Sequence, residues 1–592
     1  MFMTPHLWTG ESLLFVRRTV ALACLLALSA CGVTAGTGGG PVSTGAGDGP
    51  AIKPAEAARL QVAGANADPL PATRADQRPN IVLVVMDDFS LDLVKTLRSA
   101  RDMRRRGADY SHAFVVDSLC CVSRSSIFTG QYPHQTGVRT NTSGTASGMP
   151  LGGWSAFESN GNPERSFNVA LQQSGYTTGF IGKYLNEYEW VPGRALPPAP
   201  PGWSEFNVVF GSAYDGWDFA STRLASGRLQ VQMHDAPPLT APMKERDKAY
   251  AGRVIQDQAL RFIKRHQAGD APYFLEVAAY APHNRTQPQP YYPGDPVFPP
   301  AFRDRPHDGK PGNCGRVACT DLTTKDLPGF GDKRRDNHPL TAQGEPAKHW
   351  NTRRNPFRTA VSVGDLRNRA MMAQSVDRTV RKILRKVDDN TYVVFTSDNG
   401  FHLGQNGLGR GKGTAYDTDV HVPLFVVGPG VVKGKRAELT SNIDLAPTFE
   451  ELAGLTPQPY RFGASLVPTF GDPAVVRRNY VFMEHTAQAL TKKDPDSALT
   501  GDELDRIPSY VAVRSATGLL IRYDFDNAPT RADYGYEFYS YRNRAWEKTN
   551  SFAQPRYAAE VATLRQKLSD FDLCSAQAGA APVPDTCRAL TR

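Results

Sequence analysis

The chain has 592 residues, 40% of them hydrophobic, and a formal net charge of +9 from 68 Lys and Arg against 59 Asp and Glu. This composition can bury a large core, which excludes a mostly disordered protein. The basic excess is spread along the chain rather than gathered in one block, which argues against a dedicated nucleic-acid-binding protein. No internal run reaches the roughly 18 apolar residues of a membrane-spanning helix, which excludes a polytopic membrane protein.

Residues 1–31 have the features of a secretory signal. Arg17 and Arg18 precede a short apolar run, and small residues lie directly before Cys31. Such a pattern predicts export. A Cys after Leu-Ser-Ala resembles the lipobox of bacterial lipoproteins, in which that Cys is lipidated and becomes the mature N-terminus. We therefore expect a lipoprotein anchored to a membrane through Cys31 in the cell envelope. The alternative is a plain cleaved signal and a secreted protein.

Residues 32–78 are predicted to form a flexible linker. The segment is rich in Gly, Thr and Ser at first and in Ala and Pro later, and it has no apolar periodicity. A flexible coil of this length spans roughly 35–40 Å. That reach would hold a folded domain clear of a bilayer.

Three apolar runs further along the chain predict strands of one parallel sheet. They cover residues 80–86, 273–280 and 391–396, and their β-branched and aromatic content is typical of strands buried on both faces. Apolar residues recur at helical spacing over 250–263 and 372–387. Strands that alternate with helices predict an α/β fold, with a large doubly wound mixed sheet flanked by helices over residues 79–455.

The rest of the chain has a different pattern. Residues 285–360 are rich in Pro, Gly and charge, which predicts a long excursion over one face. Residues 456–592 contain paired strand patterns and a final helix, which predict a smaller antiparallel subdomain. Two short-spaced cysteine pairs are plausible disulfides of an oxidising compartment, Cys314 with Cys319 and Cys574 with Cys587. Cys120 and Cys121 are left over.

Polar residues follow each of the three predicted strands. Asp87 and Asp88 directly follow the first strand, and His283 lies three residues after the end of the second strand. Asp398 and Asn399 come just after the last strand. Ligands bind at the carboxyl ends of such strands. Oxygen ligands from two strand ends suit a hard divalent cation, and flexible oxygen coordination favours Ca²⁺ over Mg²⁺. Taken alone, each acidic or amide pair is equally typical of a turn or a helix cap.

The segment from Cys120 to Gly130 carries the most specific pattern in the chain. Its sequence, CCVSRSSIFTG, resembles the sulfatase signature C-x-[P/A]-S-R-x-x-x-x-T-G. Four further segments follow the order of that family: 175–188, 396–404, 422–424 and 442–448. Residues 79–590 therefore resemble the sulfatases of the alkaline-phosphatase-like superfamily. The Cys-Cys-x-Ser-Arg segment, the segment around Lys183 and the terminal cysteine pair are most similar to the N-acetylglucosamine-6-sulfatase branch.

The resemblance implies a role for each matching residue. Cys120 would be oxidised to formylglycine by a formylglycine-generating enzyme and would join Asp87, Asp88, Asp398 and Asn399 at the metal. A hydrated aldehyde has one hydroxyl to attack sulfur and a second whose collapse expels sulfate. The remaining implied roles are orientation of the nucleophile by Arg124, sulfate binding by Lys183 and Lys412, acid catalysis by His283 and pocket lining by His402. His134, in the Tyr-Pro-His segment, is equally typical of a site residue and of a structural hydrogen-bonding group.

Two positions depart from the family pattern. Val122 stands where the signature has Pro or Ala, which bears on how efficiently Cys120 is modified. Leu185 stands where many sulfatases have His two residues after the first Lys, which leaves the proton acceptor on the nucleophile unassigned. The glucosamine-6-sulfatase branch also has Leu at this position.

The leading hypothesis is a sulfuric ester hydrolase that acts on a sulfated sugar, such as a glycosaminoglycan, or on a related aryl or alkyl sulfate. One alternative keeps the fold and changes the ester to a phosphodiester or phosphonate. Another is an inactive lipoprotein that binds sulfated glycans through Arg124, Lys183 and Lys412. No nucleic-acid partner is expected.

Overall fold

The computed structural model describes residues 78–592 except 147, 226–227, 333–335, 352–356, 488–493, 498–503, 527–532, 544–545 and 577–578. The expected signal, the linker and Cys31 therefore lie outside the described residues. The described part of the chain belongs to one compact unit. Within it, no helix is both long enough and apolar enough to cross a membrane.

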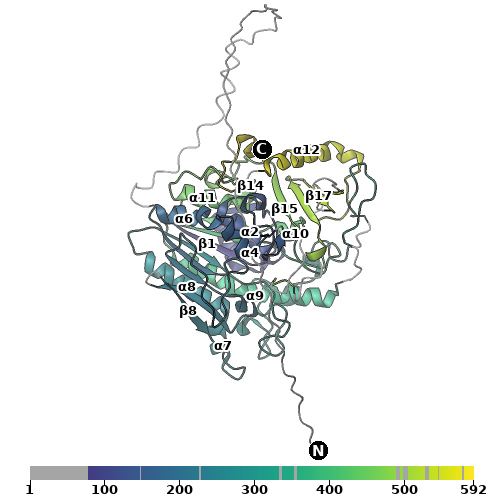
Figure 1. Ribbon diagram of the computed structural model, residues 1–592. Helices are drawn as coiled ribbons and strands as arrows, with labels where there is room; N and C mark the ends of the chain where they lie inside the picture. The colour runs from purple at the N-terminus through teal and green to yellow at the C-terminus, as the bar shows by residue number, and fades with distance from the viewer. Residues whose placement is uncertain are drawn as a thin grey trace, which may run out of the picture. The chain divides into compact units, whose positions relative to one another are not determined.

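An eight-stranded mixed sheet forms the centre of the fold (Figure 1). The strand order is β14-β2-β13-β10-β1-β9-β5-β6, so the three strands predicted from apolar runs lie side by side. β1 pairs in parallel with both β9 and β10, which confirms the predicted fold class. The strands are β1 (Asn80–Met86), β2 (Ala108–Phe114), β5 (Thr177–Gly182), β6 (Glu205–Val208), β9 (Tyr273–Ala278), β10 (Thr391–Ser397), β13 (Leu424–Val427) and β14 (Gly434–Ser441).

Helices cover both faces of this sheet. The side chains of β1 alternate between the two hydrophobic cores that lie between the sheet and these helices. Val82, Val84 and Met86 point into the core below α8 and α9, whereas Ile81, Leu83 and Val85 point into the core below α2, α6 and α11. The first face carries α1 (Arg98–Arg106), α8 (Ala251–His266) and α9 (Thr359–Lys386); the second carries α2 (Cys120–Thr129), α4 (Gly153–Ser159), α6 (Phe167–Gln173) and α11 (Leu445–Leu452).

A second, four-stranded antiparallel sheet forms the C-terminal part of the fold, as predicted (Figure 1). Its order is β15-β16-β17-β18, and α12 packs on it through Leu564, Leu568 and Phe571. A disulfide joins Cys574 at the end of α12 to Cys587 in α13. The elements are β15 (Val481–His485), β16 (Ser509–Arg514), β17 (Gly518–Asp524), β18 (Tyr534–Ser540), α12 (Ala558–Cys574) and α13 (Asp585–Ala589). β15 was not predicted from the sequence.

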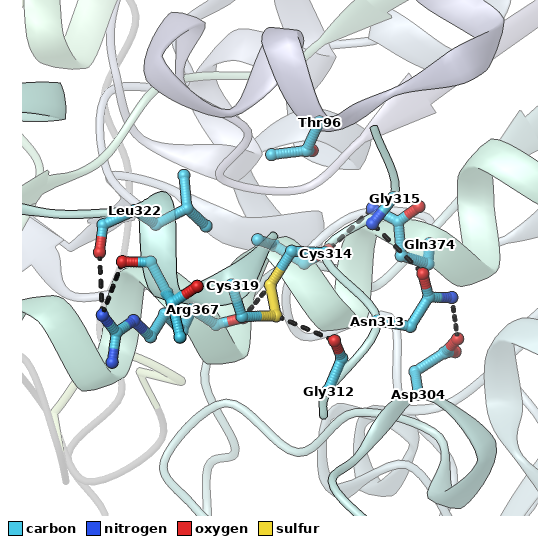
Figure 2. The surroundings of a disulfide bond; sticks show 12 residues. Thr96, Asp304, Gly312, Asn313, Cys314, Gly315, Cys319, Leu322, Arg367 and Gln374 are labelled. Atoms are coloured by element: carbon cyan, nitrogen blue, oxygen red, sulfur yellow. Dashed lines mark hydrogen bonds between the residues drawn. A yellow bond between two sulfur atoms is a disulfide. The ribbon is translucent and has the colours of Figure 1, made fainter. Parts of the chain in front are cut away.

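The excursion between β9 and α9 is held against the first face of the large sheet. Its described residues form only 3-10 turns and isolated bridges. The disulfide between Cys314 and Cys319 closes a short loop there (Figure 2). Arg316 N–H donates to the carbonyl of Thr96 at 3.0 Å, and Arg367 on α9 donates to the carbonyl of Leu322 at 3.2 Å. The loop is therefore fixed to α9 and to the segment before α1.

Smaller elements complete the described part of the chain. Three two-stranded sheets are formed by β3 (Thr145–Ala146) with β4 (Met149–Pro150), β7 (Phe219–Ala225) with β8 (Arg228–His234), and β11 (His402–Leu403) with β12 (Arg410–Gly411). Four short helices are α3 (Pro133–Thr136), α5 (Asn162–Arg165), α7 (Met243–Ala249) and α10 (Asp417–Val420).

Candidate active site

The candidate site lies where four neighbouring parallel strands end. Asp87 and Asp88 follow β1, and Asp398 and Asn399 follow β10. Lys183 follows β5, and His283 lies five residues after β9. The order β10-β1-β9-β5 brings these carboxyl ends to one edge of the sheet. All six side chains are buried, so the site is shielded from bulk water.

The backbone at Asp88 has an unusual conformation that its neighbours maintain. Its φ is +59°, in the left-handed region that non-glycine residues seldom adopt. Its N–H donates to Oδ1 of Asp398 at 3.1 Å, and its carbonyl accepts from Arg369 on α9. The next N–H, of Phe89, donates to Ser397 Oγ at 2.9 Å. Contacts from β10 and α9 thus fix this turn.

Glycine is required where β5 turns into Lys183. Gly182 has a φ of +116°, and an added Cβ would meet the carbonyl oxygen of Ala278 at 1.8 Å. The close approach allows the N–H of Lys183 to donate to that carbonyl at 3.0 Å. The lysine is therefore fixed at the strand edge by its own backbone.

Cys120 is the first residue of α2, and its sulfur lies among the acids. The thiol donates to Oδ1 of Asp87 at 3.4 Å, and Oδ1 of Asp88 lies 3.9 Å away. Lys412 Nζ lies 2.9 Å from the same sulfur. Burial raises the pKa of the Cys120 thiol well above its ordinary value, against the lowering effect of Lys183 and Lys412. Cys121 N–H donates to Asn141 Oδ1 at 3.1 Å, and the Cys121 side chain packs in the hydrophobic core on the second face of the sheet.

The cluster can hold a divalent cation. Potential ligand atoms of Asp87, Asp88, Cys120 and His283 all lie within 4.8 Å of one another. Asn399 Nδ2 donates to Asp88 Oδ1 at 2.6 Å. Among the described residues, the buried Asn399 Oδ1 and Asp88 Oδ2 have no hydrogen-bond partner. Buried oxygens without a donor are costly. A cation bound by these oxygens would remove that cost, so the residues present fit a hard metal ion.

Basic side chains surround the carboxylates. Lys183 Nζ lies 2.7 Å from Asp87 Oδ2, and Lys412 Nζ lies 2.7 Å from Asp88 Oδ1. Although burial lowers the pKa of Lys183, Asp87 and Cys120 raise it by more, so Lys183 stays protonated. Lys412 likewise has a pKa well above its ordinary value, because Asp496 and Asp88 outweigh its burial. The site therefore contains fixed positive charge next to Cys120.

His283 has one ring nitrogen fixed by the backbone and the other directed at acids. Its Nδ1 lies 2.7 Å from the carbonyl of Asn284. A carbonyl only accepts, so Nδ1 carries a proton. Its Nε2 lies 3.6 Å from Asp88 and 3.3 Å from Asp496. Burial lowers the pKa of His283, but Asp88 and Asp87 outweigh it and the net direction is upward. This arrangement makes Nε2 a candidate proton donor in the site.

Several residues of the site were not predicted from the sequence. Tyr214 packs on His283 with ring centroids 4.5 Å apart, and Lys183 Nζ lies 4.9 Å from its ring centroid. Asp496 lies 3.2 Å from Lys412 and accepts from Asn141 Nδ2 at 3.3 Å. For Arg369 the sequence held a signal, because it stands three residues before Met372 on the apolar stripe of α9. Asp496 and Asn141 lie in irregular segments with no such signal.

Two other histidines have different surroundings. His402 Nδ1 lies 2.9 Å from Asp419 Oδ1, and β11 places His402 opposite Gly411, directly before Lys412. Asp419 thus orients His402 next to the segment that carries Lys412. His134 Nδ1 lies 2.8 Å from Glu484 Oε1 on β15, and its ring stacks on Tyr132. These contacts of His134 are structural.

The five family-like segments have distinct places in the fold. Asn442 supports α2, because its Oδ1 accepts from Val116 N–H at 3.1 Å and its Nδ2 donates to Ser123 Oγ at 2.9 Å. Residues 175–188 form β5 and the turn with Lys183, and 396–404 end β10 and form β11. Residues 422–424 lead into β13. Apart from residues 422–424, these segments, which lie far apart along the chain, either carry or support the same site.

A large mixed sheet flanked by helices, with acids, lysines and a helix-borne cysteine at the carboxyl ends of its parallel strands, defines an α/β protein whose candidate site lies at that edge. Residues 79–455 match the family model described as Sulfatase. This match covers more than half of the chain, and the chain belongs to the sulfatase family.

Individual relatives support the same family. The chain is 29% identical over 441 residues to the N-acetylglucosamine-6-sulfatase of Homo sapiens, covering 71% of this chain and 69% of that protein. It is 30% identical over 412 residues to an extracellular sulfatase SULF-1 homolog of Drosophila melanogaster, covering 66% of this chain. The chain spans only 31% of that relative and 49% of a putative extracellular sulfatase of Caenorhabditis elegans.

Solved structures show the same fold. One is a protein in complex with its substrate D-glucosamine-2-N,6-O-disulfate, with a TM-score of 0.57, 19% identity, and coverage of 84% of this chain and 98% of that chain. Another is a phosphonate monoester hydrolase from Silicibacter pomeroyi, with a TM-score of 0.57, 17% identity, and coverage of 84% and 95%. At these identities the likeness concerns the fold alone.

Proposed function

We propose that the protein is a sulfuric ester hydrolase that releases inorganic sulfate from a sulfated sugar. One observation carries the proposal: the buried acids Asp87 and Asp88 at the end of β1 and basic groups from three other segments gather around the sulfur of Cys120. Membership of the sulfatase family supports the reaction class. Relatives named N-acetylglucosamine-6-sulfatase support an amino sugar sulfated at O6 as the substrate.

The proposed nucleophile is formylglycine formed from Cys120. Its hydrate supplies one hydroxyl that attacks sulfur. The second hydroxyl then collapses to restore the aldehyde, and this step expels sulfate. In the unmodified chain Cys120 lies at the start of α2, beside Asp87 and Lys412. The positive end of that helix and the lysine both favour negative charge on the attacking group.

A divalent cation is proposed at Asp87, Asp88, Asp398, Asn399 and residue 120. Ca²⁺ is favoured over Mg²⁺ because Ca²⁺ accepts flexible coordination by several side-chain oxygens, whereas Mg²⁺ demands octahedral geometry and usually keeps several waters. When bound, the ion supplies Lewis acidity that favours the deprotonated nucleophile. Arg124 neutralises Asp398 and is anchored on the carbonyl of Lys183, so it orients the ligands without competing for the ion.

The sulfate group is proposed to bind between Lys183, Lys412 and His283. The two lysines stabilise the charge that shifts onto the sulfate oxygens during transfer. His283 Nε2 is directed into the site by the bond that fixes Nδ1, and it delivers a proton to the leaving alcohol oxygen. His402, oriented by Asp419, lines the same pocket.

The protein is proposed to act outside the cytoplasm. Relatives named extracellular sulfatases and the signal-like residues 1–31 support export. A lipid on Cys31 would anchor the chain to a membrane, and a formylglycine-generating enzyme would be a partner only during maturation. The substrate is then a sulfated carbohydrate of the cell exterior.

Release of sulfate from N-acetylglucosamine 6-sulfate by the mature, metal-loaded protein tests the proposal, with Cys120→Ala as the inactive control. Absence of sulfate release from this sugar and from an aryl sulfate would overturn it. The phosphonate monoester hydrolase fold neighbour supports one competing function. Faster turnover of an aryl phosphonate than of the aryl sulfate by orders of magnitude would favour that competitor. A wild type without activity that binds sulfated glycans as tightly as Cys120→Ala does would favour a binding protein.

A further inference from the structure

An acid from the C-terminal subdomain reaches the place proposed for the sulfate group. Asp496 lies in the described residues 494–497, between β15 and β16. Its Oδ1 lies 3.3 Å from His283 Nε2, and its Oδ2 lies 3.2 Å from Lys412 Nζ. The residue is only 1% exposed. A buried carboxylate therefore contacts two of the three groups proposed to hold an anionic substrate.

Neighbouring contacts fix this carboxylate in its place. Asn141 Nδ2 donates to Oδ2 at 3.3 Å, and the N–H of Asp496 donates to Asp494 Oδ1 at 2.9 Å. Although burial raises the pKa of Asp496, Lys412 and His283 lower it by more, so the group is ionised. A fixed negative charge thus borders a site whose substrate is negative.

The negative charge of Asp496 repels a bound anion more strongly when that anion carries more negative charge. A sulfate monoester carries one negative charge, and so does a phosphonate monoester. A phosphate monoester carries nearly two at pH 8, because its second pKa is about 6. At an effective dielectric constant of about 20, unit charges roughly 6 Å apart interact strongly enough to change binding by about 100-fold. The second charge of a phosphate monoester would experience this repulsion in addition to the first.

We propose that Asp496 is a specificity-determining residue that favours transferred groups with a single negative charge over groups with two. The inference rests on the proposed function, because it takes Lys412 and His283 as the groups that bind the transferred anion. The carboxylate of Asp496 would distinguish substrates by the charge of the transferred group. It would not distinguish sulfur from phosphorus.

The test compares metal-loaded, mature wild type with Asp496→Asn on three nitrophenyl esters at pH 8. These are 4-nitrophenyl sulfate, 4-nitrophenyl phenylphosphonate and 4-nitrophenyl phosphate. We expect Asp496→Asn to raise kcat/KM for the phosphate relative to both singly charged esters by at least about tenfold. The ratio between the two singly charged esters should stay within about twofold.

Two further variants separate charge from structure. Asp496→Glu keeps the charge and should keep the wild-type preference. Glu484→Gln removes a carboxylate of the same subdomain that pairs with His134 outside the site, and it should leave the preference unchanged. A second readout needs no turnover: inorganic sulfate, a dianion, should bind Asp496→Asn more tightly than wild type by a similar factor in calorimetry.

The outcomes distinguish this inference from the proposed function. A wild type that cleaves the sulfate ester while Asp496→Asn keeps the same phosphate-to-sulfate ratio overturns the role of Asp496 alone. Equal loss on all three esters, with weaker sulfate binding, also overturns it, because Asp496 would then only support the site. A wild type that cleaves no sulfate ester contradicts the proposed function, and the binding of inorganic sulfate still tests the charge effect.

Discussion

Arg124 Nε lies 2.8 Å from Oδ2 of Asp398, although 274 residues separate the two along the chain. The contact joins the first turns of α2 to the end of β10. Arg124 Nη1 also donates to the carbonyl of Lys183 at 2.8 Å, so one side chain connects three segments of the site. The two contacts come from different nitrogens of the planar guanidinium, and the single nitrogen of an ammonium group does not reproduce that geometry.

Replacing Arg124 by Lys should therefore impair the site while keeping the charge. We expect kcat/KM for the sulfate ester to fall by about 100-fold or more, because Asp398 and Lys183 lose a shared support. Stability should also fall, since weakening one partner of a buried ion pair costs up to about 3–5 kcal/mol. Steady-state kinetics and thermal unfolding measure the two effects. The exposed Arg105→Lys on α1 is the control, and an equally active Arg124→Lys would contradict the assigned role.

The adjacent cysteines should differ in their chemistry. In protein from the native host, the tryptic peptide 107–124 should carry an aldehyde at Cys120 and an intact thiol at Cys121, as read by mass spectrometry. Cys120→Ala should lose at least about 10⁴-fold in kcat, because it removes the nucleophile. Cys121→Ala is the matched control, since Cys121 is equally buried and should leave the aldehyde in place. Full activity with an unmodified Cys120 would refute formylglycine catalysis.

Removal of the metal should lower stability as well as activity. Asp87, Asp88 and Asp398 repel one another without a cation, and Asn399 Oδ1 lacks a donor among the described residues. Chelation should reduce Tm, and Ca²⁺ at about 100 times its Kd should restore about 2.7 kcal/mol. Calorimetric scans with added Ca²⁺ or Mg²⁺ measure this effect, with Ca²⁺ effective at the lower concentration.

A pair of Asn variants makes the metal test specific. Asn399→Ala should need more Ca²⁺ for the same gain in Tm. Asn168→Ala removes a buried amide that donates to Pro201 away from the site, so it should lower Tm without changing the response to Ca²⁺. Identical Ca²⁺ titrations for both variants would count against Asn399 as a ligand.

Glu276 on β9 should make the protein less stable as the pH rises. Burial raises the pKa of this carboxyl to about 8, although Arg124 lowers it in part. The unfolded chain releases the proton near pH 4.5, so between about pH 4.5 and 8 the folded state binds more protons, and its stability falls with rising pH. Glu276→Gln removes this dependence. Its gain in the free energy of unfolding over wild type should therefore be about 1–3 kcal/mol larger at pH 8 than at pH 5.

Urea unfolding of wild type and Glu276→Gln at both pH values measures that difference. Glu158→Gln, at an exposed position of α4, should show the same difference from wild type at pH 5 and at pH 8. If Glu276→Gln and wild type differ equally at the two pH values, Glu276 is ionised in the folded protein and the prediction is wrong.

Much of the fold was readable from the sequence because its strongest signals are local. The runs at 80–86, 273–280 and 391–396 are continuous and β-branched, and they became β1, β9 and β10 with shifts of at most two residues. Helical periodicity located α8 and the second half of α9. β15 was missed because Val481–His485 is too short to show a period, and its strand state depends on pairing with β16.

The sequence by itself determined the class of fold, the family and the residue types around Cys120, since motif spacing and apolar periodicity are written in consecutive residues. Only the tertiary structure decided that β9 and β10 both flank β1, because strand order depends on packing between segments hundreds of residues apart. It also decided that Asp496 lies beside Lys412 and His283. No local pattern indicates that place, where two buried positive partners keep a carboxylate ionised in the interior.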